Sequence, residues 1–172
     1  YSYTNKEGDR KHYMPGRLSE DTPLLMEDGE HSISISPDEK TLDTVSAESA
    51  SVKVIKETTP TLYEDEEKLP VTAKYSSPQS SADFAYESGE EGVKETITLK
   101  ERPESNTFTY VLRLKGLTPE KNPTDAGITF FDKDTGNIAA DISPAWMNDA
   151  SGNAYSEDIT YDIKKAEGDR YI

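Results

Sequence analysis

The sequence predicts an all-β fold, an antiparallel β-sandwich of about nine or ten short strands with little helix. Three observations predict it. Apolar residues alternate with polar ones in short runs. Clusters of Gly, Pro, Asn, Asp and Ser separate these runs. No stretch places apolar residues at the helical spacing i, i+3, i+4 and i+7. Short strands at even spacing are typical of sandwiches and open barrels.

The residues typical of turns indicate where the first elements of the chain begin and end. Residues 1–23 mix charges, Gly and Pro without periodicity, so we expect an extended lead-in to a single domain over 24–172. Residues 24–36 predict a hairpin, because the pair Asp28-Gly29 supplies the positive φ of a tight turn. Segment 37–50 is polar and Ser-rich, which leaves a loop and a short helix both open. Surface loops or turns are predicted over 58–70, 76–81 and 118–126.

Alternation identifies the remaining strands, which are predicted over 51–56, 71–75, 82–87, 93–100, 107–115, 127–131, 138–142 and 159–164. The clearest hairpin spans 82–100, with Val93, Ile97 and Leu99 on one face and Glu95 interrupting it. Residues 170–172 begin a strand shorter than the usual five or six residues. We therefore expect the domain to continue past Ile172, whose strand needs downstream residues or a neighbouring molecule to complete it.

The composition excludes several classes of binding partner and chemistry. The 172 residues carry 19 Lys and Arg against 34 Asp and Glu, a net charge of −15, which argues against nucleic acid and anionic membrane surfaces as partners. No apolar run is long enough to insert into a membrane. The absence of cysteine excludes disulfides, thiolate catalysis and zinc-thiolate sites. A low content of Leu, Ile, Val and Phe is typical of disorder, but the strand pattern outweighs it.

No motif predicts an enzyme or a cofactor. The two histidines, His12 and His31, lie in the lead-in and at a strand edge, and no nucleophile elbow is present. Glu95 is the one carboxylate in an unexpected place, and an ion pair or a rim position explains it better than acid–base catalysis. Metal binding is not predicted, because the acidic turns lack the spacing of a calcium loop. The weak candidates for a metal site are Asp132, Asp134, Asp149 and Asn153.

Aromatic side chains offer the other possible site. Trp146 is the single tryptophan and lies beside two turn clusters, so one interpretation is a sugar-stacking platform that it forms with Tyr155 and Tyr161. A lone tryptophan in a small β domain is more often buried. We therefore expect Trp146 to anchor the core, in which case its replacement by Ala costs about 3–5 kcal/mol.

Several short motifs occur in one order along residues 82–172. They include Phe84-Ala-Tyr86-Glu87, Gly92-Val93-Lys94-Glu95-Thr96-Ile97-Thr98-Leu99, Leu112-Arg113-Leu114-Lys115-Gly116-Leu117, Phe131-Asp132-Lys133-Asp134-Thr135-Gly136, Met147-Asn-Asp149-Ala-Ser-Gly152 and Ser156-Glu-Asp158-Ile159-Thr-Tyr161. This order resembles a module of the large secreted, wall-associated YD-repeat (Rhs-like) proteins of Gram-positive bacteria.

The resemblance implies a non-catalytic structural or adhesive β-module of an extracellular, cell-wall-associated protein. Its implied partners are neighbouring domains of the same polypeptide and cell-wall or host polysaccharide, with no cofactor. The alternative is a carbohydrate-binding module that uses Trp146 and the nearby tyrosines.

Overall fold

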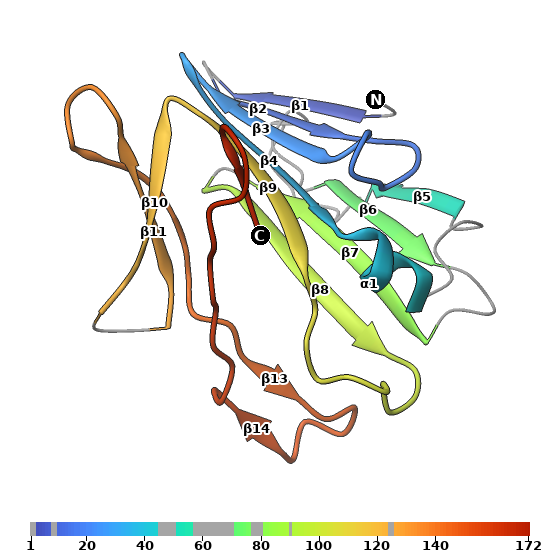
Figure 1. Ribbon diagram of the computed structural model, residues 1–172. Helices are drawn as coiled ribbons and strands as arrows, with labels where there is room; N and C mark the ends of the chain where they lie inside the picture. The colour runs from blue at the N-terminus through green and yellow to red at the C-terminus, as the bar shows by residue number, and fades with distance from the viewer. Residues whose placement is uncertain are drawn as a thin grey trace, which may run out of the picture. The chain divides into compact units, whose positions relative to one another are not determined.

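The all-β prediction is confirmed by the computed structural model, which describes residues 3–7, 10–44, 51–56, 71–76, 81–89, 91–123 and 126–172. This part of the chain holds fifteen strands and one six-residue helix (Figure 1). The predicted loop over 58–70 and most of the predicted turn over 76–81 lie outside the described residues. The strands form four separate antiparallel sheets.

The chain divides into two compact units, where the sequence predicts a single domain. The first unit holds Tyr1–Gly29 and Ile33–Leu112, and the second holds Glu30–Ser32 and Arg113–Ile172. Each unit is described below by itself.

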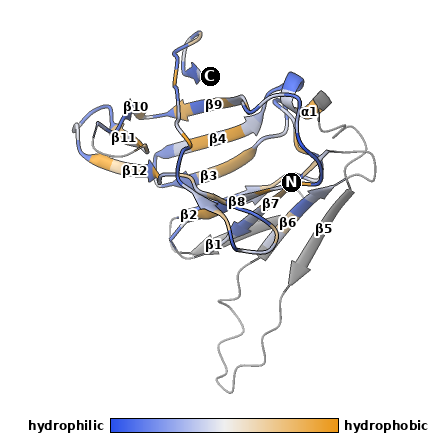
Figure 2. Cartoon of the chain, turned by 90° about the horizontal axis from the view of Figure 1, so that it is seen from below, coloured by the Kyte–Doolittle hydropathy of each residue, from blue (hydrophilic) through white to orange (hydrophobic). Residues whose placement is uncertain are grey.

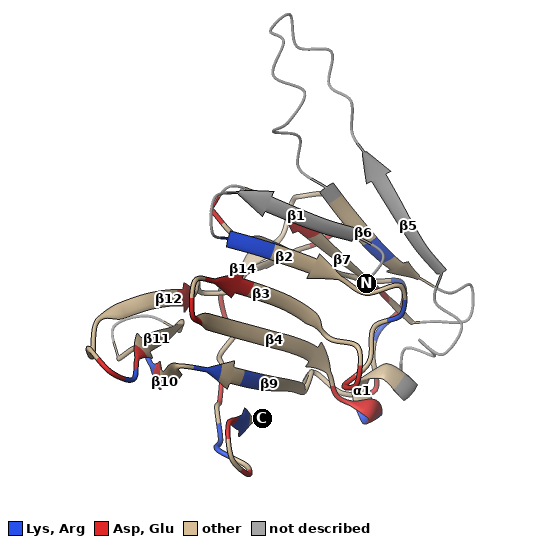
Figure 3. Cartoon of the chain, turned by 90° about the horizontal axis from the view of Figure 1, so that it is seen from above, with Lys and Arg blue, Asp and Glu red and all other residues tan. Residues whose placement is uncertain are grey.

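The largest sheet has six strands in the order β1-β2-β3-β4-β9-β15. Its strands are β1 (Tyr3–Glu7), β2 (Arg10–Met14), β3 (Leu24–Asp28), β4 (His31–Pro37), β9 (Tyr110–Lys115) and β15 (Arg170–Tyr171). The predicted hairpin is present as β3 and β4, and Gly29 has a φ of 58° in their connection. Figure 3 shows opposite charges meeting on β2 and β3, where Arg10 Nε lies 3.0 Å from Asp28 Oδ2.

A second sheet joins β5 (Ser51–Lys56), β6 (Val71–Ser76), β7 (Ala82–Ser88) and β8 (Val93–Leu99) in that order. The predicted hairpin over 82–100 is β7 paired with β8 in antiparallel register. Between β4 and β5, helix α1 (Glu39–Thr44) occupies the segment in which a loop and a helix were both open. Asp38 begins this helix, since its Oδ1 accepts the N–H of Thr41 at 2.7 Å.

The first unit is sandwich-like, because side chains from both of its sheets share one core. Met14 and Leu24 of the larger sheet cluster with Tyr75, Phe84 and Tyr86 of the smaller one, and all five are at most 3% exposed. The Tyr75 and Tyr86 rings pack edge-on, with centroids 5.9 Å apart. Figure 2 shows the apolar segments on β3 and β4.

The expected lead-in over residues 1–23 is wrong. Residues 3–14 form β1 and β2, which pair with each other and join the sheet through β3. Met14 is fully buried, and Leu18 is only 4% exposed. Tyr75 fixes the segment further, since its hydroxyl donates to the carbonyl oxygen of Pro15 at 2.8 Å.

The second unit contains two small sheets. One joins β10 (Leu117–Lys121), β11 (Ile128–Asp132) and β12 (Ile138–Ile142), and the other joins β13 (Met147–Asn148) to β14 (Tyr155–Ser156). Two predictions are wrong here. Residues 118–121 of the predicted loop belong to β10, where Pro119 is tolerated because the strand lies at a sheet edge. The predicted strand over 159–164 is not a strand, although Lys165 bridges to Tyr171 of β15.

Candidate functional site

The β13–β14 hairpin of the second unit carries the candidate site. Its strands are only two residues long, with Asn148 opposite Tyr155 and Met147 opposite Ser156. The carboxylate of Asp149 closes the turn. Its Oδ1 accepts the backbone N–H groups of Asn153 at 2.8 Å and Ala154 at 3.1 Å. Strands this short gain little from their own ladder, so these contacts in the turn hold the hairpin together.

This turn accounts for two of the four weak metal candidates. The hydroxyl of Ser151 donates to Asp149 Oδ2 at 2.6 Å and is the largest cause that lowers the pKa of Asp149. Asn153 contributes its backbone N–H to the same carboxylate. Within the described ranges, no group of three His, Asp or Glu side chains is placed to hold a metal ion.

Two exposed aromatic rings lie together on the hairpin. The centroids of Trp146 and Tyr155 are 5.9 Å apart with an angle of 31° between the ring planes. Trp146 is 53% exposed and Tyr155 is 62% exposed, so the expectation that Trp146 anchors the core is wrong. We call Trp146 and Tyr155 the aromatic platform. Neighbouring aromatic side chains with this much exposure are suited to contact with a flat apolar surface of a ligand.

A carboxylate lies at the edge of this platform. The Tyr155 hydroxyl donates to Glu157 Oε1 at 2.6 Å, and this hydrogen bond is the largest cause that raises the pKa of Tyr155. Residues 155 and 157 are two apart, the spacing that places side chains on one face of an extended segment. The sequence analysis missed Glu157, and this i, i+2 spacing was the available signal.

Tyr161, the third predicted platform residue, is placed differently. It is half-buried, whereas Trp146 and Tyr155 are exposed. Its hydroxyl lies 3.5 Å from the carbonyl oxygen of Ser143, at the long limit of a hydrogen bond. The rings that the structure brings together are those of Trp146 and Tyr155.

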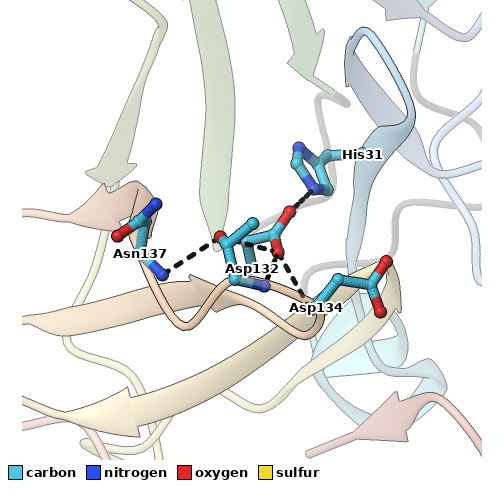
Figure 4. A network of polar contacts seen from close by, with 5 residues as sticks. His31, Asp132, Asp134 and Asn137 are labelled. Carbon is cyan, nitrogen blue, oxygen red and sulfur yellow. Dashed lines mark hydrogen bonds and ion pairs between the residues drawn. The ribbon is translucent and has the colours of Figure 1, made fainter.

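The other two metal candidates lie in the turn between β11 and β12, shown in Figure 4. Asp132 Oδ1 accepts the backbone N–H groups of Asp134 at 2.9 Å and Thr135 at 2.6 Å. The N–H of Thr135 is the largest cause that lowers the pKa of Asp132 to about 2. Asp132 therefore organises its own turn, and Asp134 contributes a backbone N–H to it rather than a carboxylate ligand.

The second oxygen of Asp132 ties this turn to the β3–β4 connection. His31 Nε2 lies 2.6 Å from Asp132 Oδ2, and both residues belong to the second unit (Figure 4). Gly116 permits this contact, because a Cβ at that position would lie 2.9 Å from His31 Cδ2. Its φ of 71° also favours glycine. His31 is thus used as a cross-link between strands.

Glu95 has a comparable structural use in the first unit. It accepts a hydrogen bond from the Tyr86 hydroxyl at 2.6 Å and from the Tyr110 hydroxyl at 3.0 Å. Although the residue as a whole is exposed, desolvation of its carboxyl end against Tyr86 raises its pKa, which the two hydroxyl donors partly offset. Of the two expected explanations for Glu95, an ion pair or a rim position, its exposure fits the rim position, and its partners in these contacts are two tyrosine hydroxyls.

Two further buried polar groups of the first unit also have partners. His12 Nδ1 lies 2.8 Å from the hydroxyl of Ser88, which is fully buried and therefore closed to a substrate. Burial is the largest cause that lowers the pKa of His12. Asp83 lies 2.7 Å from Lys100 Nζ and 3.4 Å from Lys74 Nζ, across neighbouring strands.

No family model, no curated protein and no solved structure matches this chain. In the part of the chain that the structure describes, none of the helices has the length and apolar character needed to cross a membrane.

Proposed function

We propose that the chain is a non-catalytic, adhesive β-module of an extracellular, cell-surface-associated bacterial protein. The observation that carries this proposal is the aromatic platform of Trp146 and Tyr155, exposed on a hairpin of the second unit. The order of motifs that resembles the wall-associated YD-repeat proteins supports the extracellular setting, and neighbouring domains of that polypeptide are its other partners.

The use of the polar side chains supports a non-catalytic role. His31 and Asp132 join two connections, Glu95 accepts two tyrosine hydroxyls, and Asp149 closes a turn. Each of these groups stabilises strands or turns through partners within its own unit. These contacts give each side chain a structural use, so its placement is explained without a catalytic role.

Carbohydrate is the ligand class that the platform fits best. The C–H faces of a pyranose ring are flat and apolar, so they stack on exposed indole and phenol rings. The Glu157 carboxylate at the rim supplies an acceptor for sugar hydroxyl groups. We therefore propose a polysaccharide of the cell wall or of a host surface as the adhesive ligand.

Intrinsic fluorescence tests this proposal directly, because Trp146 is the only tryptophan. Soluble cell-wall and host polysaccharides should shift or quench its emission, and Trp146→Ala should abolish binding measured by calorimetry. Ile138→Ala is the matched control, since Ile138 is 70% exposed in the same unit. If every polysaccharide leaves the emission unchanged, the adhesive role is wrong and a purely structural module remains.

A separate experiment tests the proposed extracellular location. Antibodies raised against the chain should label intact cells of the bacterium that encodes it as strongly as permeabilised cells. Labelling confined to permeabilised cells would contradict the extracellular location.

A further inference from the structure

We propose that the aromatic platform selects a cationic amino sugar, a 2-amino-2-deoxypyranose unit whose amino group is not acetylated. This inference rests on the proposed carbohydrate-binding role and deepens it by naming the charge of the sugar. It follows from where the Glu157 carboxylate lies relative to the Tyr155 ring and from the charge of the surrounding segment.

The position of Glu157 matches the direction of an equatorial substituent. A phenolic hydroxyl lies in the plane of its ring, so the Glu157 Oε1, 2.6 Å from the Tyr155 hydroxyl, lies beyond the ring edge. A pyranose stacked on this ring directs its equatorial groups outward, parallel to the same plane. An equatorial amino group therefore reaches toward the carboxylate.

Glu157 has capacity for a second donor. In the described part of the chain, Tyr155 is the single hydrogen-bond donor to its side chain, and it uses Oε1. A carboxylate offers about four lone-pair sites on two oxygens, so Oε2 remains for an ammonium group of the ligand. An ammonium bound there makes a charge-assisted hydrogen bond, which a neutral hydroxyl or acetamide group cannot match in strength.

The charge of the segment points the same way. Residues 142–163 contain four carboxylates and no Lys or Arg. Asp162 is paired with Lys164 at 3.2 Å, and Asp149 is engaged by its own turn, which leaves the exposed carboxylate of Glu157 at the edge of the Tyr155 ring. The negative charge of Glu157, in a segment without Lys or Arg, repels uronic acids and phosphorylated sugars and attracts a cation. The faces of the two rings add a cation–π attraction.

The test compares three oligosaccharides with the same β-1,4 pyranose backbone: oligomers of glucosamine, of N-acetylglucosamine and of glucose. Calorimetry at about pH 6 keeps amino groups protonated and exposed carboxylates ionised. We expect the glucosamine oligomer to bind about tenfold more tightly than the other two, as one exposed ion pair with one cation–π contact predicts. Glu157→Gln should reduce this preference to about threefold or less.

The control is Glu167→Gln, which removes one negative charge from an exposed residue of the same unit. It should leave the preference unchanged and so separates the local carboxylate from the overall charge. Trp146→Ala should abolish binding of all three oligomers. If Trp146→Ala still binds the glucosamine oligomer, the contact is a general attraction to a polycation and the inference fails.

The failures of the two proposals are distinguishable. Equal affinities for the three oligomers overturn the selection of a cationic sugar and leave the carbohydrate-binding role in place. The same preference in Glu157→Gln and Glu167→Gln also overturns the inference, because the carboxylate at the ring edge would then not be responsible. Binding of none of the oligomers, together with no response to polysaccharides, overturns both.

Discussion

The cluster of Glu95 with two tyrosines provides a sharp test of how the first unit is stabilised. Tyr86 is 2% exposed, and its hydroxyl donates to Glu95 Oε1 at 2.6 Å. Tyr86→Phe removes this donor while the ring stays buried. A hydrogen bond to a charged group contributes about 1.5–3 kcal/mol. Because Glu95 is exposed and keeps the Tyr110 donor, we expect a loss at or just below the lower end of that range, about 1–2 kcal/mol of unfolding free energy.

The reverse change has a different cost. Glu95→Ala leaves the Tyr86 hydroxyl without its acceptor, and an unsatisfied buried polar group costs about 1–3 kcal/mol. In the double variant, neither group remains to be satisfied. The double variant should therefore lose about 1–2 kcal/mol less than the sum of the two single variants.

Urea unfolding followed by far-UV circular dichroism measures this coupling. Phe84→Ala shows which transition belongs to the first unit, since Phe84 is 2% exposed in that core and its truncation costs about 3–5 kcal/mol. The unfolding free energies of Tyr86→Phe, Glu95→Ala and the double variant are then measured on that same transition. A coupling below about 0.5 kcal/mol, the usual limit for independent sites, would refute the idea that this hydrogen bond stabilises the sandwich.

Three further predictions concern the second unit. Trp146→Ala should lower the unfolding free energy by less than about 2 kcal/mol, because Trp146 is half exposed; a urea-measured loss above about 3 kcal/mol would indicate a buried ring. Gly116→Ala should destabilise by about 1–3 kcal/mol through its positive φ and the contact with His31, and an unchanged thermal midpoint would contradict this. Ionised Asp132 stabilises the fold above its ordinary pKa of 3.8, and this contribution should disappear as the pH falls from 3.8 to about 2. Thermal midpoints of the wild-type chain and Asp132→Asn should therefore converge across that window, and a constant difference would argue against it.

Alternation located the strands whose partners lie near in the sequence. The run over 93–99 and its partner over 82–88 follow the period of two and are present in the predicted hairpin. The sequence analysis failed where the presence of a neighbouring strand, rather than the alternation of residues, decides whether a segment forms a strand. Residues 159–164 alternate without forming a strand, because alternation describes an extended segment and does not supply a neighbour.

The opposite error arose at strands with weak patterns. Tyr3–Glu7 shows no alternation of apolar and polar residues, and the two-residue pair Gly8-Asp9 before Arg10–Met14 was the one signal of a hairpin. Leu117–Lys121 contains Pro119, which is a strand breaker except at an edge. Edge position depends on the whole sheet, so a local reading cannot assign it.

The candidate site was only partly predictable for the same reason. Trp146 and Tyr155 were identified as a possible platform, yet the exposure of Trp146 depends on how much of the fold covers the hairpin. Strands of two residues present too small a face to bury an indole. Composition statistics favour a buried tryptophan and contain no information on that area.

The acidic residues divide into two classes that the sequence alone does not separate. Asp132 and Asp149 both accept two backbone N–H groups of their own turns. The Thr135 N–H is the largest cause that lowers the pKa of Asp132, and the Ser151 hydroxyl, followed by the backbone N–H groups, is the largest cause that lowers the pKa of Asp149. Their carboxylates hold the backbone of these turns in place. Glu157 receives a single hydroxyl donor at the edge of an exposed ring. Glu157 is therefore an acid whose side chain is not used to hold the backbone of a turn, and the proposed selection of a cationic sugar rests on this difference.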